Sequence, residues 1–119
     1  MSRVEFMTHK GKRILLIDFS HLGPAEIPAV IAEARRVIDQ QPEKSVLTLT
    51  DLTGMHFNSE IMDAIKAYAA QNKPHVKAAA VVGMEGLLEV LVHGVERTAE
   101  RSLFNFKSRA EAQEWLCQQ

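Results

Sequence analysis

The sequence predicts a single α/β domain, a small and mostly parallel sheet of about five strands, the first antiparallel, with about four helices. Short apolar and β-branched segments alternate along the chain with longer segments whose apolar residues recur every three or four positions. The first two strand-like segments are joined by a short turn and should form an antiparallel hairpin. The 119 residues are enough for one core, so we treat residues 1–119 as one domain.

Five segments have the pattern of strands. Residues 4–8 alternate weakly, and residues 13–19 have a continuous apolar centre, which is typical of a strand covered on both faces. Residues 46–51 and 76–82 are rich in Val, Leu, Thr and Ala. Residues 103–106 form a short strand with Phe104 and Phe106 on one face.

Four segments have the pattern of helices. The first should begin near Pro24 and end before Pro42, because Pro suits the first turn and its apolar residues form one stripe. The second covers about 59–71, and the third, apolar over much of its circumference, covers about 86–100. The fourth begins with a capping box of Ser108 and Glu111. Each strand–helix–strand step implies a right-handed crossover, but the order of the strands in the sheet stays open.

Composition argues against several classes of protein. With 14 Lys and Arg against 15 Asp and Glu, the chain lacks the basic excess of a nucleic-acid binder. The lone Cys117 excludes an internal disulfide, and the five histidines lack metal-ligand spacing, so we expect no metal and no cofactor. The apolar runs 78–84 and 87–92 are too short to cross a bilayer, and the first residues do not resemble a signal peptide. We therefore expect a cytoplasmic protein without stable membrane insertion.

The loop after the third strand, residues 51–60, is the main candidate site. It follows the carboxyl end of a strand, where functional loops of open α/β sheets lie. Asn58 or Ser59 is placed to cap the second helix, and phosphate is favourable at a helix start. Met55 and Phe57 either pack under that helix or contact a partner. The predicted partner-contact residues are Asp51, Thr53, Met55, Phe57 and Asn58.

Segment 51–59, Asp-Leu-Thr-Gly-Met-His-Phe-Asn-Ser, and the order of elements resemble the STAS domain family, the fold of bacterial anti-sigma factor antagonists. In that family an Asp-Ser pair opens a helix, and a partner kinase that is also the anti-sigma factor phosphorylates the serine. Asn58 and Ser59 stand in the place of that pair, with one residue fewer before them. The resemblance therefore implies Ser59 as phosphoacceptor and an anti-sigma factor or kinase-like regulator as partner.

The chain also resembles the STAS-like branch related to CRAL-TRIO lipid-binding proteins. The likeness rests on Val81-Val82-Gly83 and on a final Phe-x-Ser/Thr-x-x-Glu-Ala-x-x-Trp-Leu pattern. The residues that fit this final pattern are Phe106, Ser108, Glu111, Ala112, Trp115 and Leu116.

Two functions follow from these patterns. The first is a non-enzymatic regulatory module that binds a protein through the 51–60 loop, since no catalytic constellation is evident. The alternative is a carrier of a small ligand or lipid, with a groove at Leu87, Leu91 and Gly94 of the third helix. Burial of that helix in a homodimer would explain the same apolar residues. An enzyme using Asp51, His56 and Ser59 is the weakest reading.

Overall fold

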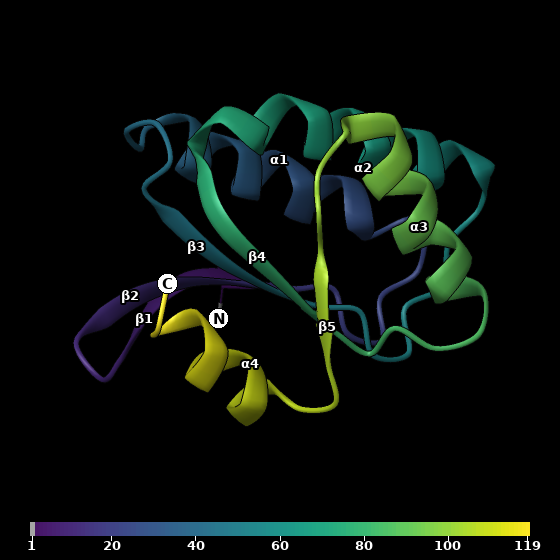
Figure 1. Cartoon of the computed structure of the whole chain (residues 1–119). Helices are drawn as coiled ribbons and strands as arrows, with labels where there is room; N and C mark the ends of the chain where they lie inside the picture. The colour runs from purple at the N-terminus through teal and green to yellow at the C-terminus, as the bar shows by residue number, and fades with distance from the viewer. Residues whose placement is uncertain (1) are drawn as a thin grey trace.

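The computed structural model describes residues 2–119. Its five strands form one sheet in the order β1-β2-β3-β4-β5 (Figure 1). β1 (Val4–His9) pairs antiparallel with β2 (Lys12–Asp18). β3 (Val46–Asp51), β4 (Val76–Val82) and β5 (Phe104–Phe106) then add in parallel. This confirms the predicted fold class and supplies the strand order that the sequence left open.

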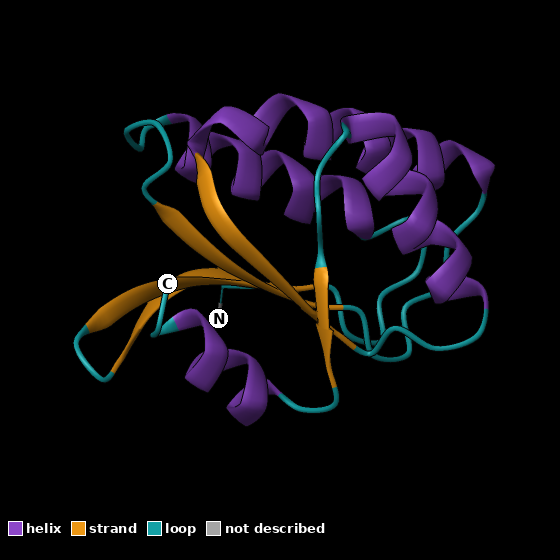
Figure 2. Ribbon diagram, in the orientation of Figure 1, coloured by secondary structure: helices purple, strands orange, loops and turns teal. Residues whose placement is uncertain are grey.

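Three helices cover one face of the sheet, and α4 (Arg109–Leu116) covers the other (Figure 2). The three are α1 (Ile27–Asp39), α2 (Ser59–Asn72), which continues into the 3₁₀ turn η1 (Lys73–His75), and α3 (Leu87–Ala99). Because β2 to β5 are added in one direction, right-handed crossovers leave α1, α2 and α3 on the same face. The chain changes face only after β5.

The sheet separates two apolar cores. Alternation along β2 illustrates the division, because Leu15 and Ile17 pack under α1–α3 while Ile14 packs toward α4. The smaller core is formed by Ile14, Leu47, Leu49, Ala80, Val82, Ala112 and Leu116. No helix among residues 2–119 has the length and hydropathy needed to cross a membrane.

The start of α1 differs from the prediction. The helix begins at Ile27, not near Pro24, because residues 24–26 form a turn in which the N–H groups of Glu26 and Ile27 both donate to the carbonyl of Gly23. Pro28, rather than Pro24, occupies the first turn. Ile27 is also the first buried residue of the apolar stripe, so the helix begins at the residue where its buried face begins.

Aromatic packing near the end of α4 holds the helix to the sheet, and a side-chain cap begins it. Trp115 packs against Phe104 and Phe106, with ring centroids 4.7 Å and 5.4 Å apart, which agrees with the predicted shared face of the two phenylalanines. Ser108 Oγ accepts the N–H of Glu111 at 3.2 Å, which is the serine half of the predicted capping box. This placement brings Arg109, at the start of α4, to the carboxyl edge of the sheet.

Candidate functional site

Two aspartates and an arginine form an ionic cluster at the carboxyl edge of the sheet. Asp18 ends β2 and Asp51 ends β3, and the two are partners in the parallel register. Arg109 lies between them, with Nε 2.7 Å from Asp51 Oδ2 and Nη2 3.3 Å from Asp18 Oδ1. The Asp51 side chain is only 8% exposed. The cluster therefore joins β2, β3 and α4, and Asp51 lies beneath the surface.

Hydrogen bonds keep both carboxylates ionised. Burial by itself would raise the pKa of Asp51, but hydrogen bonds from Thr53 and Arg109 hold that pKa below its ordinary value. Burial likewise opposes ionisation of Asp18, whose pKa is held low by hydrogen bonds from Ser20 and by the charges of Arg109 and Arg3. Both carboxylates are therefore ionised at neutral pH and form ion pairs with Arg109.

Asp51 also fixes the loop that follows it. Its Oδ1 accepts the Thr53 N–H at 2.9 Å. Further along, the N–H of His56 donates to the carbonyl of Leu22 at 2.9 Å. On the other side the β4–α3 loop approaches so closely that a Cβ on Gly83 would lie 2.4 Å from the Thr53 nitrogen. The β3–α2 loop (residues 52–58) is thus fastened on both sides and presents a defined surface.

The structure divides the five predicted partner-contact residues. Asp51 and Met55 are buried, and Met55 belongs to the larger core, so neither is available to a partner on this surface. Thr53 and Asn58 are exposed, and Phe57 is half-buried against the core. Met55 is therefore the residue that packs under the helix, one of the two placements predicted for it.

The start of α2 distinguishes the roles of Asn58 and Ser59. Asn58 Oδ1 accepts the N–H of Ile61 at 2.9 Å and is the helix cap. Ser59 is the exposed first residue of α2. Because Asn58 makes the cap, the Ser59 hydroxyl is not needed for it.

An apolar patch lies beside this loop. The side chains of Leu87 and Val90, one turn apart on α3, are 75% and 59% exposed. A shallow pocket of about 260 Å³ between the loop and the start of α3 is lined by Phe57 and Leu87 together with His56 and Glu85. We call Phe57, Leu87 and Val90 the α3 patch. Sequence reasoning had noted the apolar character of α3 without resolving which residues face solvent.

The structure does not bring Leu87, Leu91 and Gly94, the residues of the predicted ligand groove, to one surface. Leu87 points outward, whereas Leu91 is buried in the core. Gly94 faces α2, where a Cβ would lie 3.2 Å from Lys66 Cε. The space beside Gly94 is therefore occupied by a lysine side chain of the neighbouring helix.

One group of described residues could hold a metal ion. His9, Glu114 and Cys117 bring their ligand atoms within 4.8 Å of one another. Sequence spacing missed it because 105 positions separate His9 from Glu114. In this structure Glu114 pairs with His9 and Lys10, each at 2.8 Å, and those hydrogen bonds lower its pKa. The cluster thereby ties α4 to the β1–β2 hairpin.

Comparison with known proteins identifies the architecture. No protein-family model and no curated protein matches the chain. A solved structure does: an uncharacterized protein of the DUF3478 family with a SpoIIAA-like fold, from Shewanella loihica PV-4. The two share 14% identity and superpose with a TM-score of 0.72 over 96% of this chain and 92% of the other. The chain has a SpoIIAA-like fold.

This result confirms the STAS-like fold that the sequence predicted. In the SpoIIAA-like fold of this chain, Ser59 lies at the exposed start of α2, and the α3 patch lies beside the preceding loop. The residue that sequence reasoning missed most clearly is Arg109, which lies between the predicted capping residues Ser108 and Glu111. Its partner Asp51 is 58 positions away, so no local pattern could indicate the pair.

Proposed function

We propose that this SpoIIAA-like domain is a regulatory module without catalytic activity of its own, which binds a protein partner through the α3 patch. The exposure of Leu87 and Val90 carries the proposal. Large apolar side chains grouped on a surface commonly mark a contact site. Phe57 continues the group across the pocket, and the exposed Thr53 and Asn58 supply polar groups on the same loop.

Phosphorylation of Ser59 would control this contact. A phosphate adds about −1.5 to −2 charge at neutral pH. At the first residue of α2 the helix dipole and unpaired N–H groups would stabilise it, so the fold would tolerate the modification. Charge so near an apolar contact would disfavour a partner selected for the unmodified surface. An anti-sigma factor or kinase-like regulator is the partner class implied by the resemblance to STAS domains.

The polar groups of the loop support binding rather than catalysis. The Asp51 oxygens accept hydrogen bonds from Thr53 and Arg109, which argues against a role for this carboxylate as a base toward His56 or Ser59. In a catalytic arrangement of these three residues, Asp51 would hold the His56 ring by a hydrogen bond. The Asp51 oxygens are instead bonded to Thr53 and Arg109, which argues against that arrangement.

Affinity capture from the source cells tests the proposal. Wild-type protein should retain a reproducible partner that the Leu87→Ala, Val90→Ala double variant loses by at least tenfold. Arg97→Ala is the matched control, because Arg97 is an exposed residue of the same helix that lies outside the patch. The captured partner is then purified and its affinity for each variant measured by calorimetry. Equal affinity for wild type and the double variant would refute the α3 patch as the contact.

Two further measurements separate the alternatives. Ser59→Asp should weaken the purified complex at least fivefold while Ser59→Ala leaves it unchanged. Light scattering of the isolated chain addresses self-association. A wild-type homodimer that dissociates in the Leu87→Ala, Val90→Ala variant would assign the patch to a second copy of this chain and overturn the proposal.

A further inference from the structure

A second candidate site lies at the amino edge of the sheet. A cavity of about 60 Å³ occupies the interior between the sheet and helices α2 and α3. Most of its lining is apolar, with Thr48, Tyr68 and Asn72 among the polar contributors. A site needs about 15 Å³ of such volume to hold one water molecule, so this cavity has room for about four groups of that size. A short alkyl chain fills the same space.

An open groove of about 360 Å³ adjoins this cavity. Ala79 and Arg101 line both spaces, so Arg101 lies where the interior cavity meets the groove. The groove also has an aromatic wall of Phe104 and Trp115. Its volume lies in the range of small-molecule sites.

Arg101 is a cation without an anionic partner. Its Nη1 donates to the carbonyl of Ala69 at 3.0 Å and to Asn72 Oδ1, which are both neutral acceptors. Among residues 2–119, no carboxylate lies within ion-pairing distance of Arg101. Burial lowers the pKa of its guanidinium, but an arginine stays charged at neutral pH, so Arg101 is a partly desolvated cation. A guanidinium has five donors, so several remain for an anion.

Positive charge is concentrated in the groove. The cations that line it are Lys44, Lys73, Lys77 and Arg101. No Asp or Glu side chain of the described chain lines the same space. This contrasts with the sequence as a whole, in which 15 acidic residues outnumber 14 basic ones. Lys73 donates to the carbonyl of Glu100, and Lys77 donates to an α-carboxyl oxygen of the last residue, Gln119, each at 2.7 Å. An ammonium has three donors, so both lysines keep donors for an anion.

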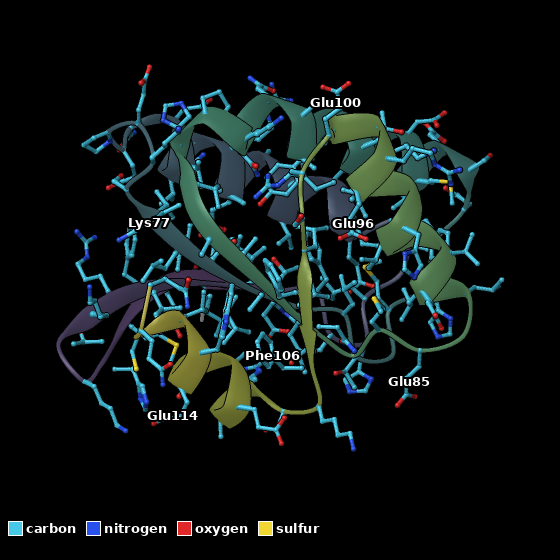
Figure 3. The ribbon with its side chains drawn as sticks, in the orientation of Figure 1. Lys77, Glu85, Glu96, Glu100, Phe106 and Glu114 are labelled. Carbon is cyan, nitrogen blue, oxygen red and sulfur yellow. The ribbon has the colours of Figure 1, made fainter. Side chains whose placement is uncertain are left out.

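We propose that this groove binds a small organic anion, a carboxylate or phosphate whose short apolar chain enters the cavity past Arg101. The lysines and Arg101 would hold the anionic group, and Phe104 and Trp115 would cover the first carbons of the chain. The site is separate from the α3 patch. Figure 3 labels Lys77 and Glu85 at opposite edges of the sheet, and Glu85 lines the pocket beside that patch.

The test compares hexanoate with acetate, and hexyl phosphate with inorganic phosphate, at constant ionic strength. Fluorescence of the single tryptophan, Trp115, and amide NMR shifts report binding in the groove. Each fully buried methylene is worth about fourfold in affinity, so hexanoate should bind at least tenfold more tightly than acetate. The carboxylate and phosphate pairs decide which anionic group is preferred.

Variants locate the binding. The Lys73→Gln, Lys77→Gln double variant should weaken hexanoate binding at least tenfold, whereas Lys12→Gln, an exposed lysine of the β1–β2 hairpin, should leave it unchanged. Ala79→Val narrows the junction and should remove the preference for hexanoate over acetate. Thermal melting confirms that each variant is folded.

Three results would overturn the proposal. They are absence of saturable hexanoate binding, equal binding by wild type and the lysine double variant, and binding only to phosphatidylglycerol-containing vesicles, which would assign the charge to a membrane surface. Partner capture through the α3 patch is unaffected by the lysine variants, so either proposal can fail alone.

Discussion

Replacing Asp51 by Asn should destabilise the fold by about 2 kcal/mol at neutral pH. The substitution preserves shape and leaves one oxygen for the Thr53 N–H, but it sets an NH₂ group against Arg109 Nε, now 2.7 Å from the carboxylate. A hydrogen bond to a charged group contributes about 1.5–3 kcal/mol. The Arg109 side chain is 38% exposed and can regain water, so the loss should fall in the lower half of that range.

Urea unfolding followed by circular dichroism measures the change. The midpoint should fall while the m-value stays the same, because the exposed area hardly changes. Asp63→Asn is the control, since Asp63 is an exposed acid on α2 and should alter stability by less than about 0.5 kcal/mol. In the double-mutant cycle with Arg109→Ala, the coupling energy should reach at least about 1 kcal/mol. Additive effects, or an Asp51→Asn loss no larger than the control, would refute the role of the pair.

Acid provides an independent check of the same cluster. The pKa values of Asp18 and Asp51 are held below their ordinary value, so their contribution is present above about pH 4 and is lost as the pH falls through the lowered values. The stability difference between wild type and Asp51→Asn should therefore narrow below about pH 4. A difference that is constant from pH 7 to about pH 2 would contradict this account.

Three further predictions concern the backbone around the site. Gly83→Ala and Gly11→Ala both place a side chain at positive φ, but only the former meets the β3–α2 loop backbone, so it should cost at least about 2 kcal/mol more in urea unfolding. Asn58→Ala should lose about 1 kcal/mol by removing the cap of α2, whereas Ser59→Ala should be near neutral; equal losses would contradict the cap assignment. Gly94→Ala should raise the melting temperature, with a gain of about 0.5–1 kcal/mol, because helix propensity improves and the neighbouring lysine chain can move aside; a clear loss would show tighter packing than observed.

Local patterns in the sequence determined the kind of each element and many of its limits. β3 and β4 occupy the predicted residues 46–51 and 76–82, because apolar runs between turn residues have few alternatives. Ser108 caps α4 as predicted, since capping depends on the backbone only three residues away. Pro24 misled the prediction because a proline can occupy a turn before a helix as readily as its first turn.

The candidate site was predictable only in part. The sequence located the β3–α2 loop and Ser59, since both depend on where a strand ends and a helix begins. It did not decide that Met55 would be buried and Leu87 exposed. A hydrophobic stripe indicates which residues share a face, but the neighbouring elements decide how much of that face they cover.

Tertiary structure alone decided the strand order and the contacts between distant residues. Arg109 meets Asp51 because the chain crosses to the other face of the sheet after β5, and Arg101 meets the cavity because α2 and α3 lie side by side. Neither contact can be predicted from a periodic pattern in the sequence, because the residues involved are separated by whole strands and helices. Sequence periodicity predicts whether a side chain faces the core or the solvent. Which residue it contacts there depends on how the complete chain packs.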